Sequence, residues 1–210
     1  MKPYYQDDSC TIYNCDCREI LPTLGTFDLV LTDPPYGIGM DGGNVSYKGA
    51  NNFAKLDWDA VTPDSETLEA CIAAGEMAAI WGGNYFQLPP SKSWLVWDKG
   101  EGFYGRTYAE VELAWTNYGV NAKIKKRDPL ARGDYHGKLH PTMKPLPLFI
   151  WCIELCPGNP QTILDPFAGS CTTGRAAKDL GRKSVMVEKE ERYCEIGAKR
   201  LAQEVFDFGP

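Results

Sequence analysis

The segment Asp33-Pro34-Pro35-Tyr36 combines residue types that can activate a weakly nucleophilic amino group. An amino group on an aromatic ring is a poor nucleophile because its lone pair is delocalised into the ring. A carboxylate and a carbonyl that accept its hydrogen bonds make the nitrogen more electron-rich, and Asp33 and the Pro34 C=O supply both. Proline fixes φ, which keeps the carbonyl aimed, and Tyr36 offers a flat π-face to an unstacked ring. A simple Asp-Pro-Pro turn is the structural alternative.

A second candidate site is the Gly-rich segment TILDPFAGSCTTG, residues 162–174. It runs from an apolar strand pattern into a helix, where small residues let a ligand approach the backbone and N-terminal amides favour an anionic group. It is not GxGxxG, which disfavours a nicotinamide cofactor. Glu188 follows about 20 residues later, a spacing that suits hydrogen bonds to ribose hydroxyls. Considered alone, the Gly-rich segment is equally well explained as an ordinary tight turn, and Glu188 as a surface or helix-capping glutamate.

These residues need strands and helices to position them, and the sequence predicts an α/β sheet with crossover helices. Seven strands are expected, at residues 11–15, 27–32, 79–81, 93–97, 111–115, 162–164 and 184–187. Helices are expected at residues 16–24, 62–78, 145–155, 172–180 and 191–204. Ligands gather beyond the carboxyl ends of the strands in such sheets, where we expect both Asp33 and Glu188.

Two segments lack the periodicity of strands or helices. Residues 37–57 are rich in Gly and Asn, which predicts a long loop, and loops of this length are usually functional lids or disordered; we favour a lid. Residues 119–139 are polar and basic and are interpreted as a short insertion, a candidate target-recognition segment. Between Gly119 and Lys144 there are seven basic residues and two acids, although the whole chain has a net charge of −6. Such a patch is typical of an enzyme that touches nucleic acid through one face, and a solvated basic loop is an equal alternative. The candidate DNA contacts are Lys123, Lys125, Lys126, Arg127 and Arg132.

Length and composition indicate one globular domain over residues 1–210. Hydrophobic content is 43%, and no apolar run approaches the roughly 20 residues that a membrane helix needs. The first residues have no apolar signal region, so we expect a cytoplasmic protein whose eight cysteines are reduced thiols. Cys15 and Cys17 form a CxC pair, but a second pair at zinc-site spacing is lacking, and His136 and His140 are the only histidines. No metal site is therefore expected.

In order and spacing, these motifs resemble the DNA amino-methyltransferases, and more closely their permuted, beta-type arrangement. There the DPPY half comes first, a target-recognition segment lies in the middle and the FxGxG cofactor half comes last. The match runs from about Thr11 to Glu204, and HPTMKP (140–145) and NCDC (14–17) resemble further family segments. The chain is similar in its compactness to solitary phage or bacterial members. The resemblance implies a circularly permuted Rossmann-like fold, with a mixed, mostly parallel seven-stranded sheet and helices on both faces.

The resemblance also implies roles for individual residues, with S-adenosylmethionine as cofactor and double-stranded DNA as partner. Catalysis would fall to Asp33, Pro34, Pro35 and Tyr36. The cofactor would be held at its methionine side by Asp165, Phe167 and Gly169, at its ribose by Glu188, at its adenine by Asp16 and at its carboxylate by Thr142 and Lys144. One departure is Cys171, where the family usually has Gly. Its Cβ reduces cofactor affinity, or the backbone there does not need a positive φ.

The implied reaction is methylation of N6 of adenine in DNA, on a base rotated out of the helix. Asp at the first catalytic position favours adenine over the alternative, N4 of cytosine, because serine is more often found there in the cytosine enzymes. A non-catalytic DNA-binding protein of the same fold is a further alternative, which cofactor binding would distinguish. The sequence is also compatible with a homodimer.

Overall fold

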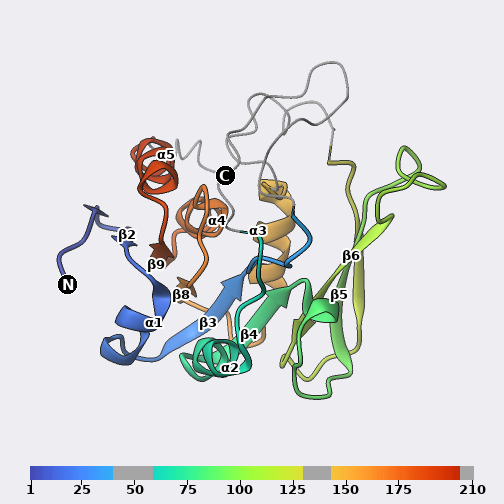
Figure 1. Cartoon of the computed structure of the whole chain (residues 1–210), viewed down its shortest axis with the longest axis horizontal. Coiled ribbons are helices and arrows are strands. Elements are labelled where there is room, and N and C mark those ends of the chain that lie inside the picture. Colours follow the sequence, from blue (N-terminus) through green and yellow to red (C-terminus); the bar gives the residue numbers. More distant parts are fainter. Residues whose placement is uncertain (40–58, 130–142, 204–210) are drawn as a thin grey trace.

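The strands form a single sheet in the computed structural model, which describes residues 1–39, 59–129 and 143–203. The sheet has nine strands in the order β1-β2-β9-β8-β3-β4-β6-β5-β7 (Figure 1). Their bounds are β1 Tyr5–Gln6, β2 Cys10–Asn14, β3 Phe27–Thr32, β4 Gly75–Trp81, β5 Ser93–Asp98, β6 Val111–Thr116, β7 Lys123–Lys126, β8 Thr162–Asp165 and β9 Lys183–Glu188.

The strand directions decide which residues meet at one edge of the sheet. β2, β9, β8, β3 and β4 are neighbours and run parallel. β6 is antiparallel to both β4 and β5, and β7 is parallel to β5. β5 and β7 therefore run in the direction of β4, and their carboxyl ends lie at the same edge as those of the five central strands. The predicted mixed, mostly parallel α/β sheet is confirmed.

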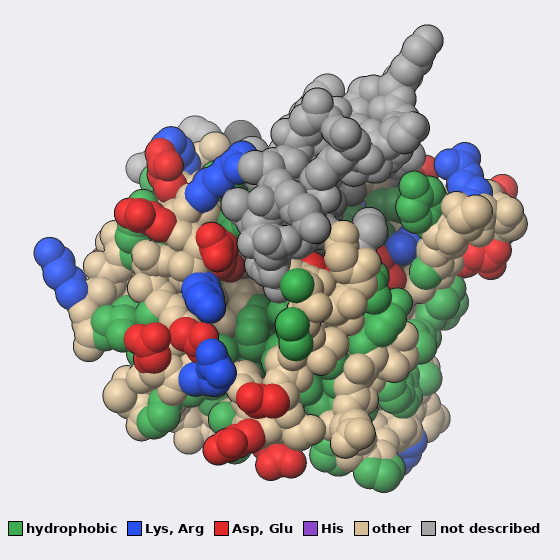
Figure 2. All heavy atoms as spheres, in the orientation of Figure 1, with side chains coloured by type: hydrophobic (Ala, Val, Ile, Leu, Met, Phe, Trp, Pro, Cys, Tyr) green, Lys and Arg blue, Asp and Glu red, His purple; other side chains and the backbone are tan. Residues whose placement is uncertain are grey.

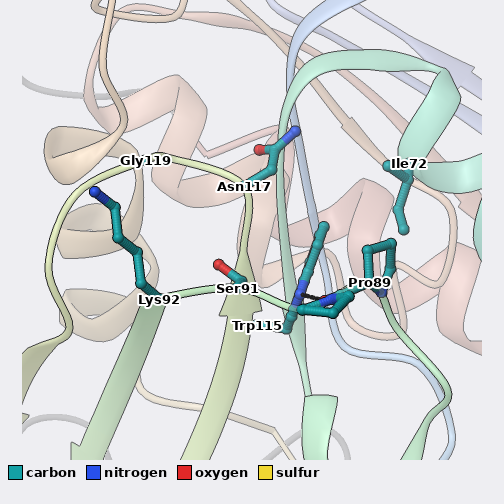
Figure 3. A pocket seen from close by; sticks show the side chains of 8 residues that line it. Ile72, Pro89, Ser91, Lys92, Trp115, Asn117 and Gly119 are labelled. Atoms are coloured by element: carbon teal, nitrogen blue, oxygen red, sulfur yellow. Dashed lines mark hydrogen bonds between the residues drawn. The ribbon is translucent and has the colours of Figure 1, made fainter.

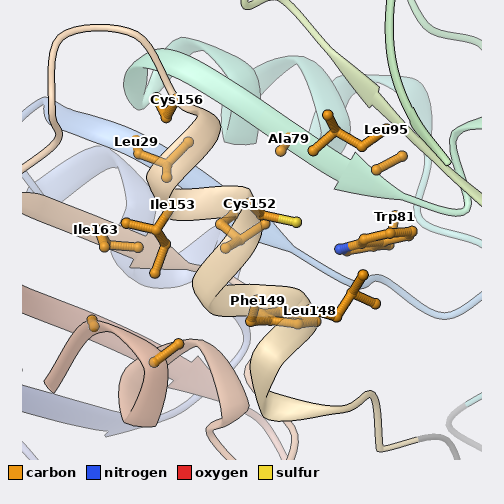
Figure 4. Packing of buried hydrophobic residues seen from close by; sticks show 14 of the residues in the cluster. Leu29, Ala79, Trp81, Leu95, Leu148, Phe149, Cys152, Ile153, Cys156 and Ile163 are labelled. Atoms are coloured by element: carbon orange, nitrogen blue, oxygen red, sulfur yellow. The ribbon is translucent and has the colours of Figure 1, made fainter. Parts of the chain in front are cut away.

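The helices cover both faces of the sheet, as predicted (Figure 1). Their bounds are α1 Cys17–Ile20, α2 Ser65–Ala73, α3 Leu146–Leu155, α4 Thr172–Asp179 and α5 Glu191–Leu201, with 3-10 turns η1 at Leu21–Thr23 and η2 at Gly83–Tyr85. Alternation along β3 explains the two layers. Leu29 and Leu31 pack on α3 and α4, whereas Val30 faces α1 and α2. Figure 4 shows the first of these layers, where Leu148 and Cys152 of α3 lie against the strands.

The predicted strand number of seven is wrong, because two short strands extend the sheet at its ends. β1 has two residues and pairs antiparallel with β2. β7 has the sequence KIKK and pairs with β5 from Leu95↔Lys123 onward. A lysine-rich strand lacks the apolar alternation by which strands are recognised, and lysines are common on edge strands because they discourage further pairing. Part of the expected insertion at 119–139 therefore belongs to the sheet.

The expected helix at residues 62–78 is also too long. α2 begins after Asp64, whose side chain accepts a hydrogen bond from the Thr67 N–H, and it ends at Ala73. β4 starts at Gly75, which pairs with Phe27 of β3. A Cβ on Gly75 would lie 2.9 Å from the Val30 side chain, so glycine permits this close pairing. The proposed lid at 37–57 lies outside the described residues from residue 40 onward.

Candidate functional site

Four acidic side chains follow the ends of four neighbouring parallel strands. Asp16 comes two residues after β2, Glu188 ends β9, Asp165 ends β8 and Asp33 follows β3. Since these strands are parallel neighbours, their carboxyl ends place the four residues along one edge of the sheet. The structure thus brings together four predicted site residues that are far apart in the sequence.

The turn after β3 is held by two residues that the sequence analysis missed. Asp59 is buried, and its Oδ1 accepts hydrogen bonds from the Tyr36 N–H at 2.7 Å and the Gly37 N–H at 2.9 Å. Gly82 has a φ of +71°, and a Cβ there would lie 2.1 Å from Cε1 of Tyr36. The Gly-Gly pair directly after a predicted strand was an available signal for a tight turn. Asp59 has no such signal, because its contact depends on the fold.

Tyr36 has a different environment from the open π-face expected of it. Its ring stacks on that of Tyr85, with centroids 4.9 Å apart and an interplanar angle of 14°. Its hydroxyl donates a hydrogen bond to Asp33 Oδ1 at 2.5 Å. Tyr36 therefore touches the carboxylate directly, and Tyr85, which is 44% exposed, presents an aromatic side chain to solvent beside it.

Lys144 lies beside Asp33 rather than on the Gly-rich turn. Its Nζ is 2.5 Å from Asp33 Oδ2 and 3.2 Å from Glu112 Oε2, and it donates to the Tyr36 hydroxyl oxygen at 2.9 Å. Only 4% of the Lys144 side chain is exposed. Glu112, in β6, was not among the predicted site residues. Nothing near it in the sequence marks it, since its partner Lys144 is far along the chain.

Burial and the opposing charges shift the pKa values of this cluster. Burial raises the pKa of Asp33, Glu112 adds to the rise and Lys144 opposes it. Burial would lower the pKa of Lys144, but Asp33 and Glu112 outweigh it and raise that pKa. Lys144 therefore remains a cation, and its charge is what favours the ionised form of Asp33.

The Gly-rich turn is organised around two further carboxylates. Asp165 is buried and accepts hydrogen bonds from the Thr32 hydroxyl at 2.7 Å, the Thr173 hydroxyl at 2.5 Å and the Phe167 N–H at 3.1 Å. Glu188 accepts from the Gly169 N–H and the Glu190 N–H, each at 2.7 Å. Burial raises the pKa of Asp165 to about 6 and that of Glu188 to about 7.

Asp16 begins α1 and is held by Arg18. Its Oδ1 accepts the Arg18 N–H at 3.0 Å as the helix N-cap, and its Oδ2 is 2.7 Å from Arg18 Nη2. The Arg18 guanidinium lowers the pKa of Asp16 to about 2. Asp16 is therefore a fixed carboxylate at the end of β2.

Cys171 adopts the left-handed conformation, with φ +57° and ψ 43°, at the N-cap of α4. The interpretation that its backbone does not need a positive φ is therefore wrong. Its side chain is fully buried and points to α5, where a Cβ on Gly197 would lie 2.4 Å from Cys171 Sγ. The thiol thus occupies space that Gly197 leaves free.

The predicted DNA-binding residues separate onto different surfaces. Lys125 Nζ lies 5.7 Å from the Trp151 ring of α3, whereas Lys126 Nζ is 2.9 Å from Glu101 Oε1. This division follows from the alternation of side chains along β7. Lys123, at the start of β7, is exposed. Arg132 and Thr142 lie outside the described residues.

A hollow lies at the opposite edge of the sheet from the candidate site. The hollow in Figure 3 is lined by Ile72, Pro89, Pro90, Ser91, Lys92, Trp115, Asn117 and Gly119. It lies where β6 ends and β5 begins, at the opposite edge of the sheet from Asp33, and Ser91 and Asn117 bond to the backbone there. On the face drawn in Figure 2, acidic and basic side chains are interspersed. In the part of the chain that the structure describes, no helix is long and apolar enough to cross a membrane.

Comparison with known proteins gives a family match. The model of a DNA methylase family, N6_N4_Mtase, matches residues 76–199. The type II methyltransferase M.ScaI of Streptomyces caespitosus is 27% identical over 97% of this chain and 84% of its own length. The type II methyltransferase M2.LlaDCHI of Lactococcus lactis subsp. cremoris is 25% identical, over 95% of this chain and 92% of its own.

Solved structures share the fold. The M1.HpyAVI–SAM complex superposes with a TM-score of 0.57 at 21% identity, covering 91% of this chain and 99% of the other. The PvuII DNA methyltransferase, described as cytosine-N4-specific, has a TM-score of 0.62 at 16% identity, covering 98% and 91%. The expected methyltransferase fold is confirmed.

Proposed function

The chain belongs to the N6/N4 family of DNA methylases, and we propose that it transfers a methyl group from S-adenosylmethionine to N6 of adenine in double-stranded DNA. The observation that carries this proposal is the position of Asp33, at the carboxyl end of β3 and beside the Gly-rich turn that follows β8. Asp33, which can accept a hydrogen bond from an amino group, therefore lies next to the turn that we propose binds the cofactor.

The residues at the sheet edge fit S-adenosylmethionine by the chemistry of their donors and acceptors. The ribose hydroxyls and adenine amino group of the cofactor are hydrogen-bond donors, and its sulfonium is a cation. Glu188 and Asp16 supply carboxylates for the ribose and the adenine, and Asp165, Phe167 and Gly169 form the turn beside them. Thr142 remains a proposed contact to the methionine carboxylate. The contacts of Lys144 favour a role at Asp33 instead.

In the proposed reaction the cofactor supplies an electrophilic methyl group, and the protein makes the target nitrogen nucleophilic. Asp33 and the Pro34 carbonyl accept hydrogen bonds from the amino group, so that its lone pair is available as the N–C bond forms. The bond between the methyl carbon and the cofactor sulfur would break as the N–C bond forms, so that a neutral thioether is the leaving group. The nitrogen then loses one proton, through Asp33, to solvent. The Tyr36 hydroxyl and Lys144 hold the two oxygens of Asp33 in a fixed orientation. The base must leave the duplex to reach a strand-end carboxylate, at a cost of a few kcal/mol.

We propose that DNA lies against the carboxyl edge of the sheet. β5 and β7 end at this edge, and the connection from β5 to β6 carries Arg106 and the exposed rings of Tyr104 and Tyr108. Lys126 and Arg127 lie at the end of β7. Cations at this edge can contact phosphates, and aromatic rings can stack on an unpaired base.

The test is mass spectrometry of nucleosides after incubation of the protein with S-adenosylmethionine and unmethylated DNA. We expect N6-methyladenine. If only N4-methylcytosine is found, the target is cytosine and not adenine. The proposed roles of the site residues would stand, because both reactions need the same hydrogen-bond acceptors. No methylated nucleoside and no binding of S-adenosylmethionine would favour a non-catalytic DNA-binding protein instead.

A further inference from the structure

Glu112 is a partly buried acid for which the proposed methyl transfer provides no role. It is the second residue of β6, near the carboxyl edge of the sheet, and 23% of its side chain is exposed. Its two oxygens have different partners. Oε2 is 3.2 Å from Lys144 Nζ, and Oε1 is 2.8 Å from Lys99 Nζ. Glu112 therefore bridges two lysines beside the proposed catalytic carboxylate, and such a network holds its side chains more firmly than a single surface ion pair does.

Together these residues form a row of alternating charge, Asp33, Lys144, Glu112 and Lys99. Asp33 follows β3, Lys144 precedes α3, Glu112 lies in β6 and Lys99 follows β5. Lys144 Nζ also lies 5.6 Å from the Trp81 ring, and Lys99 Nζ lies 5.5 Å from the Trp97 ring. Removing either partner of a buried, hydrogen-bonded charge pair leaves the other charge uncompensated, which makes such a row sensitive to single substitutions.

Resting on the proposed function, we propose that Glu112, supported by Lys99, is a positioning residue that fixes Lys144 against Asp33 and so controls the charge of the catalytic carboxylate. A lysine has a flexible four-carbon stem, and a single anion leaves its ammonium with several orientations. The second anion, at 3.2 Å on the side of β6, restricts Lys144 to the orientation in which it reaches Asp33.

The two charges have opposite effects on Asp33. Lys144 favours the ionised form and lowers the pKa of Asp33, whereas Glu112 raises it. Tyr36 also lowers that pKa through its hydrogen bond, and Asp165 of β8 is a further carboxylate within electrostatic range. Ionised Asp33 is the stronger hydrogen-bond acceptor for the amino group, because its protonated form carries less negative charge on oxygen. The rate should therefore fall on the acidic side as Asp33 is protonated.

The experiment is the single-turnover rate of methyl transfer against pH, at saturating S-adenosylmethionine and DNA, so that binding does not contribute. Lys144→Met should move the acidic limb of the rate–pH profile to higher pH. In Glu112→Gln the amide oxygen still accepts from Lys144 and holds it in place, but the negative charge is removed, so the limb should move to lower pH. A charge a few ångströms away accounts for shifts of about one to three pH units. In Lys144→Met/Glu112→Gln the limb should return toward its wild-type position. A purely structural role would reduce the rate in all three variants without moving the limb in opposite directions.

Two further variants complete the test. Lys99→Met, at the outer end of the row, should move the limb to higher pH by less than Lys144→Met does. This variant tests the same row of charges if Glu112→Gln does not fold. Glu110→Gln, an exposed acid just before β6, is the matched control and should leave the limb in place. If the wild-type protein is active and the pH of the acidic limb is unchanged in both Glu112→Gln and Lys99→Met, this inference is wrong, but the proposed function stands. A wild-type protein that transfers no methyl group would overturn the proposed function.

Discussion

The acidic residues at the sheet edge differ in what they touch. Asp33 contacts the Lys144 ammonium and the Tyr36 hydroxyl, whereas Glu188 contacts the backbone amides of Gly169 and Glu190. The first environment holds a carboxylate beside a cation at the end of β3. The second ties a carboxylate to the Gly-rich turn. This difference supports the proposed roles, in which Asp33 acts on the methylated base and Glu188 on the cofactor.

Substitution of Asp33 and of Glu188 should therefore have contrasting effects. Asp33→Ala should reduce the rate of methyl transfer by about 10²–10³ or more, because an electrostatic catalyst is lost, while S-adenosylmethionine binds within a few-fold of wild type. Glu188→Ala should weaken cofactor binding by about 1–3 kcal/mol through lost hydrogen bonds. Calorimetric titration of both variants with the cofactor, alongside rates, checks this. Loss of cofactor binding in Asp33→Ala would contradict the assignment.

At the scale of elements, the contact between α4 and α5 depends on a glycine. Gly197 of α5 faces Cys171, the left-handed N-cap of α4. Replacing a glycine by alanine inside a helix commonly stabilises it, by up to about 1 kcal/mol. Here the new Cβ would lie 2.4 Å from the buried sulfur, so the sign of the effect should be reversed.

We expect Gly197→Ala to lower the free energy of unfolding by about 1–3 kcal/mol, as overpacking does. Cys171→Gly should rescue much of this loss in the double variant, because the sulfur is removed. Gly174→Ala is the matched control. Its Cβ would lie 3.1 Å from the Met186 side chain and 3.4 Å from Cys10 Sγ, both longer than the 2.4 Å at Gly197, so its effect should be smaller. Urea unfolding of wild type, Gly197→Ala, Cys171→Gly and the double variant measures the coupling, and additive effects would refute direct contact.

The two end residues of the edge strand β7 are lysines that lie at different distances from the proposed DNA-binding edge. Lys126 ends this strand at the carboxyl edge of the sheet, whereas Lys123 begins it away from that edge. Lys126→Gln should lower the salt dependence of DNA binding by about 0.9 in the slope of log K against log salt, the contribution of one phosphate contact. Lys123→Gln should change the slope less. Fluorescence anisotropy with duplex DNA at several salt concentrations measures both slopes, and equal changes would show that position along β7 is unimportant.

At the scale of the whole molecule, the buried acids make stability depend on pH. Burial raises the pKa of Glu188 from 4.5 to about 7 and that of Asp165 from 3.8 to about 6. A group with a raised pKa in the folded state contributes stability that is complete below its unfolded pKa and lost as pH rises through its folded pKa. The protein without cofactor should therefore lose stability between about pH 4.5 and 7.

Glu188→Gln should remove part of this pH dependence. Its free energy of unfolding, relative to wild type, should rise between pH 5 and pH 7.5, because glutamine has no carboxylate charge to bury at the higher pH. Urea unfolding at the two pH values gives the difference directly. Glu69→Gln, on the exposed side of α2, should retain the wild-type dependence. A constant difference between Glu188→Gln and wild type would show that Glu188 titrates as it does in the unfolded chain.

The sequence by itself determined the central strands and the edge of the sheet at which Asp33 and Glu188 meet, and the family resemblance implied helices on both faces. Its information was local, because apolar alternation and abrupt strand ends are properties of a few consecutive residues. It also carried the family resemblance through motif order. β7 escaped because KIKK has the composition of a solvated segment, and only its pairing with β5 makes it a strand.

The tertiary structure alone decided what the site residues touch. Lys144 contacts Asp33 and Glu112, from which it is separated by many residues, and Asp59 holds the backbone of Tyr36. Such contacts depend on strand order and helix packing, which bring distant residues together without a sequence pattern. The left-handed backbone of Cys171 likewise has no signal in its residue type, because non-glycine residues rarely adopt it, and its packing on Gly197 is visible only in the folded chain.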